Sequence, residues 1–217
     1  MYTDDLPYMD EGYRITFPEP DPSDEYGIVM VGGNLSPGIL LSAYEQGVFP
    51  WFEAHQPILW WNPPVRCILF PDNYHISKSM RRFICKTTYR VTRDRAFSQV
   101  IRSCKEIDRH GQQGTWITDD MVEAYEKLHQ LGYAHSYEVW DGHTLAGGLY
   151  GIQMHHYFCG ESMFSKASNT SKLAFFHLYQ DLIVDRGFSF IDFQVTNSHS
   201  ESLGTVEIPR DQFLSML

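Results

Sequence analysis

The spacing of apolar residues predicts a series of helices and strands from residue 89 to residue 195. In the stretch 118–131 apolar side chains recur every three or four positions, Thr118 can cap the first turn, and Gly132 can end the helix. Alternation on both sides of Asp141-Gly142 predicts a hairpin, because this dipeptide favours a tight turn. The predicted elements are strand 89–92, helix 96–107, helix 118–131, strand 134–140, strand 144–154, strand 157–162, helix 171–186 ended by Gly187, and strand 190–195. This order predicts an α+β fold on one mostly antiparallel sheet.

The first 85 residues carry shorter patterns. The segment 1–26 is acidic and contains four prolines, so we expect an extended lead-in with a short strand around 14–17. A helix is predicted from Pro37 to Glu45, with Ser36 as its N-cap and Gly47 after its end. The other predicted elements are strand 27–33, strand 66–71, and a basic helix 75–85 that Ser77 can cap.

An aromatic stretch follows the first helix. Residues 49–64 contain three tryptophans and two phenylalanines among four prolines. Two interpretations are open: the rings form the core of a small lobe, or they form a rigid wall for a planar ligand.

The composition indicates a folded chain without a membrane span. Of the 217 residues, 43% are apolar and 20% charged, a balance that supports a core and argues against wholesale disorder. No run approaches the ~20 apolar residues that span a bilayer, and the acidic first ten residues do not resemble a signal peptide. The four cysteines form no CxxC pair, which argues against a disulfide scaffold or a zinc ribbon. We therefore expect a cytoplasmic protein with no membrane partner.

The net charge of −10 is unevenly distributed. Residues 78–109 contain ten of the seventeen bases and only three acids, so this segment carries +7 and the rest of the chain −17. The bases are Lys78, Arg81, Arg82, Lys86, Arg90, Arg93, Arg95, Arg102, Lys105 and Arg109. The segment is either a solvated surface or a contact for a polyanion such as nucleic acid.

Several common sites are excluded by the sequence. It has no GxxxxGK[ST] or GxGxxG phosphate loop and no HExxH motif. The neighbouring His155 and His156 would point to opposite faces of a strand and could not chelate one metal. We expect no metal and no cofactor.

A cluster of two acids and an amide is the remaining candidate for chemistry. Alternation along strand 190–195 puts Asp192 and Gln194 on one face. Glu161 likewise lies between apolar residues. A single buried acid is often a structural acceptor, but the three together indicate a polar centre beside an apolar pocket.

Nine sequence motifs together resemble those of the bacterial leucyl/phenylalanyl-tRNA–protein transferases. They are GGNLSP at 32–37, GVFPWF at 47–52, ILWWNP at 58–63, HISKSM at 75–80, GTWIT at 114–118, AHSYEV at 134–139, FCGESMF at 158–164, IDFQ at 191–194 and SLG at 202–204. The resemblance implies a small N-terminal domain, 1–70, and a catalytic domain, 71–217, of the GCN5-related N-acyltransferase type. It implies transfer of Leu or Phe, and weakly Met, from aminoacyl-tRNA to proteins that begin with Arg or Lys, which marks them for N-degron proteolysis.

The resemblance also implies roles for individual residues. Trp51 and Trp116 would hold the terminal adenosine, and Glu161, Asp192 and Gln194 would form the catalytic centre. Phe158, Met163 and Ile191 would help line the pocket for the Leu or Phe side chain. An aromatic side chain expected in helix 171–186 could be Phe175 or Phe176, with Leu178 as another candidate. The chain differs from the usual pattern at Asn34, where many members have Asp, and at 62–64.

The implied reaction needs positioning more than activation, because the aminoacyl ester is already activated. Our hypothesis is that Asp192 receives the proton of the amine or stabilises the ammonium as it loses that proton. Gln194 would orient the amine or carbonyl, and Glu161 would pair with the acceptor or hold Gln194. Bases of the 78–109 segment would contact tRNA phosphates, with Lys78, Arg81, Arg82, Lys86 and Arg90 as the tRNA-binding candidates. We expect a monomer.

Two other functions compete. An acetyl-CoA-dependent N-acetyltransferase would need an [RQ]xxGx[GA] loop, and the glycines at 147–151 lack the leading Arg or Gln. A non-catalytic RNA-binding protein would explain the basic segment but not the two acids and the amide.

Overall fold

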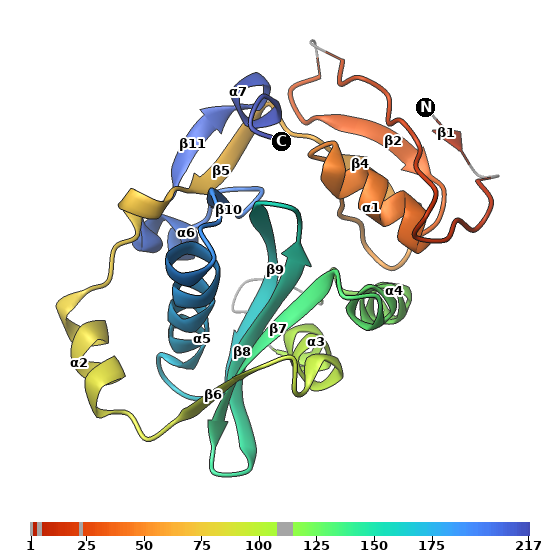
Figure 1. Cartoon of the computed structure of the whole chain (residues 1–217). Coiled ribbons are helices and arrows are strands. Elements are labelled where there is room, and N and C mark those ends of the chain that lie inside the picture. The colour runs from red at the N-terminus through yellow and green to blue at the C-terminus, as the bar shows by residue number, and fades with distance from the viewer. Residues whose placement is uncertain (1, 4–5, 22–23, 108–114) are drawn as a thin grey trace.

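The computed structural model describes residues 2–3, 6–21, 24–107 and 115–217 and contains two sheets (Figure 1). The smaller sheet has the order β1-β2-β4-β3. Its strands are β1 (Tyr2–Thr3), β2 (Ile28–Gly32), β3 (Phe49–Pro50) and β4 (Leu59–Trp61), and α1 (Pro37–Glu45) packs beside them. Gly47 ends α1 with a φ of 72°, a conformation that glycine adopts without strain.

The larger sheet has seven strands in the order β11-β5-β10-β9-β8-β7-β6. The strands are β5 (Val65–Leu69), β6 (Arg90–Arg93), β7 (Ala134–Asp141), β8 (Thr144–Gln153), β9 (Tyr157–Ser165), β10 (Phe190–Asp192) and β11 (Val206–Pro209). Every pair in it is antiparallel except β9 with β10. The predicted α+β fold class on a mostly antiparallel sheet is confirmed.

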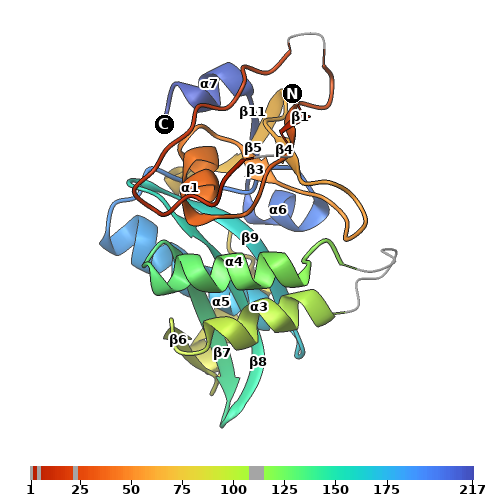
Figure 2. The same ribbon diagram turned by 90° about the vertical axis from the view of Figure 1, so that its right-hand side faces the viewer.

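Helices cover both faces of this sheet. Figure 2 shows α3 (Phe97–Glu106) and α4 (Asp119–Gln130) across one face, while α5 (Thr170–Tyr179) packs on the other. The remaining helices are η1 (Pro71–Asn73), α2 (Lys78–Lys86), the π-helical η2 (Gln180–Asp185), α6 (Ser198–Leu203) and α7 (Arg210–Leu214). Side chains of Ser77 and Thr118 cap α2 and α4 as predicted. Ser36 stands at the N-cap of α1 but makes no capping hydrogen bond.

One apolar core joins the two sheets. It runs from Leu40 and Trp60 in the N-terminal part to Val100 and Tyr150 in the rest. The chain enters the larger sheet at Val65. The division into domains 1–70 and 71–217 therefore stays a prediction.

Three predicted elements differ from the structure. No strand forms at 14–17, because the N–H groups of Ile15 and Phe17 donate to side chains of α1 and its C-cap instead of to a neighbouring strand. The helix predicted to Arg186 changes to π geometry at Gln180. The last predicted strand ends at Asp192, since Gln194 adopts a left-handed backbone with a φ of 58°.

Candidate active site

A β-bulge places Glu161 at the centre of the larger sheet. Tyr150 pairs with Ser162 and Gly151 pairs with Gly160, so Glu161 is the extra residue between two regular stretches of ladder. Such a bulge redirects a side chain and is common beside active sites. Gly151 makes room for it, because a Cβ there would lie 2.1 Å from the Cys159 carbonyl oxygen.

Two side chains from helices and one from the bend after β10 converge on the Glu161 carboxylate. Tyr44 Oη of α1 and Gln194 Nε2 donate to Oε1 at 2.9 and 3.0 Å, and Tyr125 Oη of α4 donates to Oε2 at 3.2 Å. Burial raises the pKa of Glu161 to about 7, although the hydrogen bonds from the two phenols act to lower it. Burial and the neighbouring Glu161 raise the pKa values of both tyrosines well above the usual range. Glu161 therefore titrates near neutral pH while both phenols keep their protons.

Asp192 has a different environment. Its carboxylate accepts from Arg66 Nε and Nη2 at 2.9 and 2.6 Å, and both side chains are buried. Burial acts to lower the pKa of Arg66, but the Asp192 carboxylate raises it overall. Arg66 also donates to the carbonyl of Gly47, and its guanidinium lies 4.4 Å from the centre of the Phe213 ring. This buried ion pair connects the end of α1 to the larger sheet.

Gln194 links these two acids. Its backbone N–H donates to Asp192 Oδ1 at 2.8 Å, while its side chain reaches Glu161. The prediction that Asp192 and Gln194 share a face is wrong, because the strand ends at Asp192. Asp192 points toward Arg66 and Gln194 toward Glu161.

Two adjoining cavities open beside this cluster. The first, of about 600 Å³, has mainly apolar walls and is called the apolar cavity here. The second, of about 200 Å³, is the tryptophan cavity, because Trp51 and Trp116 line it. Both cavities share the side chains of Trp116, Glu161, Phe193, Gln194 and Asn197. The polar centre therefore lies at their junction.

Most of the predicted site residues line these cavities. Phe158, Met163 and Ile191 line the apolar cavity. Glu161 and Gln194 line both, but Asp192 lines neither. Phe175 lines the apolar cavity together with Leu178, whereas Phe176 does not, so the geometry favours Phe175 over Phe176 as the inner-wall aromatic.

Sequence reasoning missed Tyr44, Tyr125, Arg66, and the cavity residues Asn197 and His199. Tyr125 lies among the apolar positions of the helix predicted at 118–131. A buried tyrosine usually finds a hydrogen-bond partner, so a hydroxyl at such a position was the available signal. The sequence offered no corresponding signal for Arg66.

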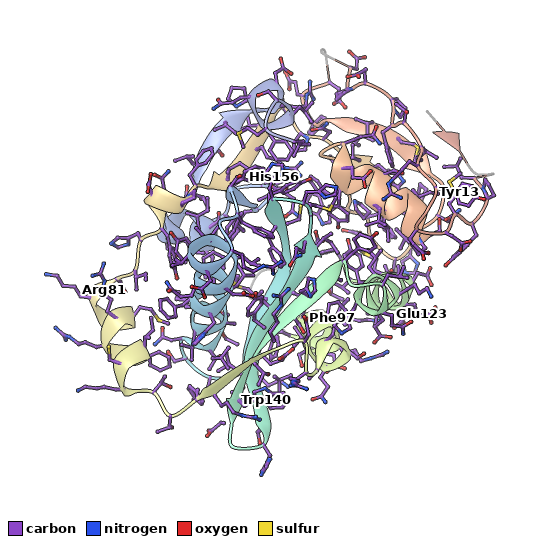
Figure 3. All side chains as sticks on the ribbon, in the orientation of Figure 1. Tyr13, Arg81, Phe97, Glu123, Trp140 and His156 are labelled. Atoms are coloured by element: carbon purple, nitrogen blue, oxygen red, sulfur yellow. The ribbon has the colours of Figure 1, made fainter. Side chains whose placement is uncertain are left out.

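The tRNA-binding candidates lie away from the cavities, on and after α2. Lys78, Arg82, Lys86 and Arg90 are exposed, and so is Arg81, whose side chain points outward in Figure 3. In the part of the chain that the structure describes, none of these five bases forms an ion pair. Arg109 lies outside the described residues.

The described residues contain no group of three or more His, Cys, Asp or Glu side chains that could hold a metal ion. Among the helices of this part of the chain, none is long and apolar enough to cross a bilayer.

Comparisons with known proteins point to one family. The description "Leucyl/phenylalanyl-tRNA protein transferase" matches residues 68–217, and the description of its N-terminal domain matches residues 33–64. The chain is 50% identical over 204 residues to a leucyl/phenylalanyl-tRNA–protein transferase of Flavobacterium psychrophilum, covering 94% of this chain and 96% of the relative. A protein of the same name from Pseudoalteromonas atlantica is 53% identical over 195 residues, covering 90% and 82%.

Among solved structures, that of FemX aligns with this chain at 11% identity and a TM-score of 0.50. The alignment covers 82% of this chain and 70% of the FemX chain. At this identity the likeness concerns the fold alone. The likeness supports the α+β fold on a mostly antiparallel sheet that the sequence predicted.

Proposed function

Because the chain belongs to the leucyl/phenylalanyl-tRNA protein transferase family and is therefore an aminoacyltransferase, we propose that it transfers Leu, Phe and, weakly, Met to proteins that begin with Arg or Lys. The product would enter N-degron proteolysis. We further propose that the protein acts in the cytoplasm, because its amino-acid donor is charged tRNA. We also propose that it is a monomer. The observation that carries the proposal is the Glu161–Gln194 pair at the junction of the apolar and tryptophan cavities.

The apolar cavity suits the side chain of the donor amino acid. Phe158, Met163 and Ile191 would contact this side chain, and Phe175 would close the inner wall. Size selection by an apolar wall discriminates one methylene by only ~1–3 kcal/mol, so some Met transfer is expected beside Leu and Phe.

The tryptophan cavity suits the terminal adenosine of tRNA. Trp51 is 46% exposed and its ring centre lies 5.6 Å from that of Trp61, which holds the ring in place. Stacking of a base on such a ring contributes ~1–3 kcal/mol. Trp116 lines both cavities and would lie between the adenosine and the amino acid.

The polar centre would receive the acceptor amine. Glu161 can pair with a positively charged N-terminus, and Gln194 can orient the amine or the ester carbonyl. Asp192 is engaged by Arg66 and does not reach the cavities. We therefore assign Asp192 the role of a positioning residue that fixes Gln194 through its backbone N–H.

The decisive experiment supplies leucyl-tRNA and a peptide that begins with Arg, with and without acetyl-CoA. Leucyl-peptide formation that does not depend on acetyl-CoA would support the proposal. Acetylation of the peptide, or RNA binding without any transfer, would reject it in favour of one of the two competing functions.

Met163→Ala probes the apolar cavity in the same assay. The partly buried Met163 side chain fills one wall, so its truncation should lower kcat/KM for leucyl-tRNA by about tenfold or more, ~1–3 kcal/mol. The matched control is Met9→Ala, which truncates a partly buried methionine outside both cavities. Equal activities of the two variants would remove Met163 from the donor site.

The bases on and after α2 would contact tRNA phosphates. Such contacts release counterions, so the affinity for tRNA should fall steeply as salt rises. Replacement of Arg82 by Ala should reduce the slope of log K against log salt by about 1, whereas Lys127→Ala on α4 should leave it unchanged. Affinity that stays flat from low to moderate salt would contradict the electrostatic contact.

A further inference from the structure

Four oxygen atoms of Tyr44, Tyr125 and Glu161 form a closed group of hydrogen-bond contacts. Each phenol contacts one carboxylate oxygen, at 2.9 and 3.2 Å, and the two phenol oxygens contact each other at 2.5 Å. Both tyrosines are buried, with exposures of 1% and 0%, and they approach Glu161 from α1 and α4. This group is called the phenol–carboxylate cluster.

The number of protons in the cluster is the informative feature. When Glu161 is ionised, the two phenols supply two protons for three oxygen–oxygen contacts. One contact then places lone pairs against each other. The amide of Gln194 cannot relieve this shortage, because its N–H points to Oε1. A third proton, carried by the carboxyl group, would give every contact a proton of its own.

Glu138, a buried glutamate of the same sheet, has no such shortage. Its carboxylate accepts from the hydroxyls of Thr92 and Ser136 and from the N–H groups of Arg95 and Ala96, so each contact has its own proton. Glu138 is also absent from the walls of the apolar and tryptophan cavities, whereas Glu161 lines both. The proton shortage therefore coincides with access to the cavities.

The other charged and titratable groups around the cluster lie on β5, β8, β9 and β10. The ring centre of Tyr150 on β8 lies 5.7 Å from that of Tyr125, and Tyr150 acts to raise the pKa of Tyr125. Asp192 of β10 acts to raise the pKa of Glu161 and Arg66 of β5 acts to lower it, and the two are paired with each other. Cys159 lies on the same strand as Glu161, and burial raises the pKa of its thiol well above the usual value. Burial raises the pKa of Glu161 itself to about 7.

We propose that Tyr44, Tyr125 and Glu161 act as one proton-accepting unit, in which Glu161 takes the proton of the acceptor ammonium and the hydroxyl hydrogens of the two phenols rearrange around the protonated carboxyl group. This inference rests on the proposed aminoacyl transfer. The ammonium gives one proton to Glu161, and its freed lone pair attacks the ester carbonyl carbon to form the C–N bond. Collapse of the oxyanion breaks the bond to the ribose 3′-oxygen, which takes the second proton of the nitrogen. The cluster then returns its proton to solvent.

A carbon-13 NMR titration of the free protein tests the unit without any substrate. The labels are the Glu side-chain carboxyl carbon and the Tyr Cζ. The Glu161, Tyr44 and Tyr125 signals should move together with one midpoint near 7, because a single proton rearranges all three contacts. In Glu161→Gln, whose amide supplies the third proton at every pH, the two tyrosine signals should stop titrating. Tyrosine signals that ignore the Glu161 midpoint would overturn the proposal.

Single-turnover transfer of Leu to an Arg-starting peptide adds the kinetic test. Glu161→Gln should lower the rate by about 10²- to 10⁴-fold. Tyr125→Phe should lower the rate and displace the pH midpoint by about half a unit or more, whereas a merely structural tyrosine would leave the midpoint in place. Tyr179→Phe, which removes a phenol that donates to the carbonyl of Pro71, is the matched control and should change neither.

The proposed function and the proton-accepting unit are rejected by different results. Wild-type protein that forms no leucyl-peptide would reject the proposed function, whatever the NMR titration shows. Wild-type transfer with an unshifted midpoint in Tyr125→Phe, or with full activity in Glu161→Gln, would reject the proton-accepting unit alone.

Discussion

Asp192 and Glu161 are both carboxylates near the junction of β9 and β10, and their partners give them opposite properties. Asp192 faces the permanent cation of Arg66 in a bidentate pair. Glu161 faces two neutral phenols and one amide, and burial raises its pKa to about 7. Burial alone therefore does not decide what an acid can do. A charged partner favours a fixed structural role for the acid. Neutral hydrogen-bond donors allow the acid to gain and lose a proton.

The two acids also differ in what they hold together. The Arg66–Asp192 pair fastens Gly47 at the end of α1 and the Gln194 turn. Removal of either partner would leave an uncompensated charge in the interior. Glu161 holds Tyr44 and Tyr125 but lines the cavities, where a substrate can reach it.

The largest expected effect is on stability, from Arg66→Met. The variant leaves Asp192 charged and buried without its partner, so the free energy of unfolding should fall by ~3–5 kcal/mol. Urea denaturation at pH 7 measures this loss. Arg102→Met is the matched control, since Arg102 is exposed, Glu126 is only half-buried, and their pair should contribute about 0–1 kcal/mol. If both variants lost a similar free energy of unfolding, the buried pair would not stabilise the fold more than the exposed pair.

The next effect is the pH dependence of stability in Glu161→Gln. Folding raises the pKa of Glu161 from 4.5 to about 7, so the folded state binds the proton more tightly than the unfolded chain. The stability that this proton gives is complete below pH 4.5 and is lost as the pH rises through 7. Each pKa unit corresponds to ~1.4 kcal/mol, so the variant should exceed the wild type by up to ~3 kcal/mol above pH 8 and by little at low pH. Urea denaturation from pH 5 to pH 9 checks this, and a gain that does not grow with pH would contradict it.

The smallest effect is on the catalytic rate of Asp192→Asn, measured in the folded fraction, because this variant also leaves Arg66 unpaired in the interior. The amide keeps an oxygen for the N–H of Gln194 but loses the charge that Arg66 requires, so Gln194 should be held less firmly. We expect about a tenfold lower kcat, ~1.4 kcal/mol, with the pH midpoint of the rate unchanged. A midpoint that moves in Asp192→Asn and stays in Glu161→Gln would return the proton-accepting role to Asp192.

Local patterns in the sequence predicted most elements of the fold. Helices such as α4 and hairpins such as β7–β8 have their caps and turn residues next to them in the chain, and these elements formed close to the predicted bounds. The strand at 190–195 failed because its alternation continues past Asp192, while the left-handed backbone of Gln194 depends on a hydrogen bond that sequence spacing does not reveal. The segment after residue 196 has no strong periodicity, and α6, β11 and α7 were missed.

Without the family resemblance, which supplied the tryptophans and the apolar wall residues, the site could be predicted only for residues whose chemistry is unusual in their surroundings. Glu161 and Gln194 are polar residues in apolar stretches, so they were recognised. Tyr44 and Tyr125 suit an apolar helix face, and their role depends on three elements meeting at one carboxylate. Arg66 and Asp192 lie 126 positions apart, and no local pattern reports such a pairing.

The bulge at Glu161 bears on how such a site can arise. Because the hydrogen-bonded pairs on either side of residue 161 would close into a continuous register without it, the sheet does not need this residue. One inserted codon in a regular strand could therefore have supplied the reactive group while the surrounding scaffold stayed intact. Deletion of the same codon would be expected to leave a chain that still folds but no longer catalyses the transfer.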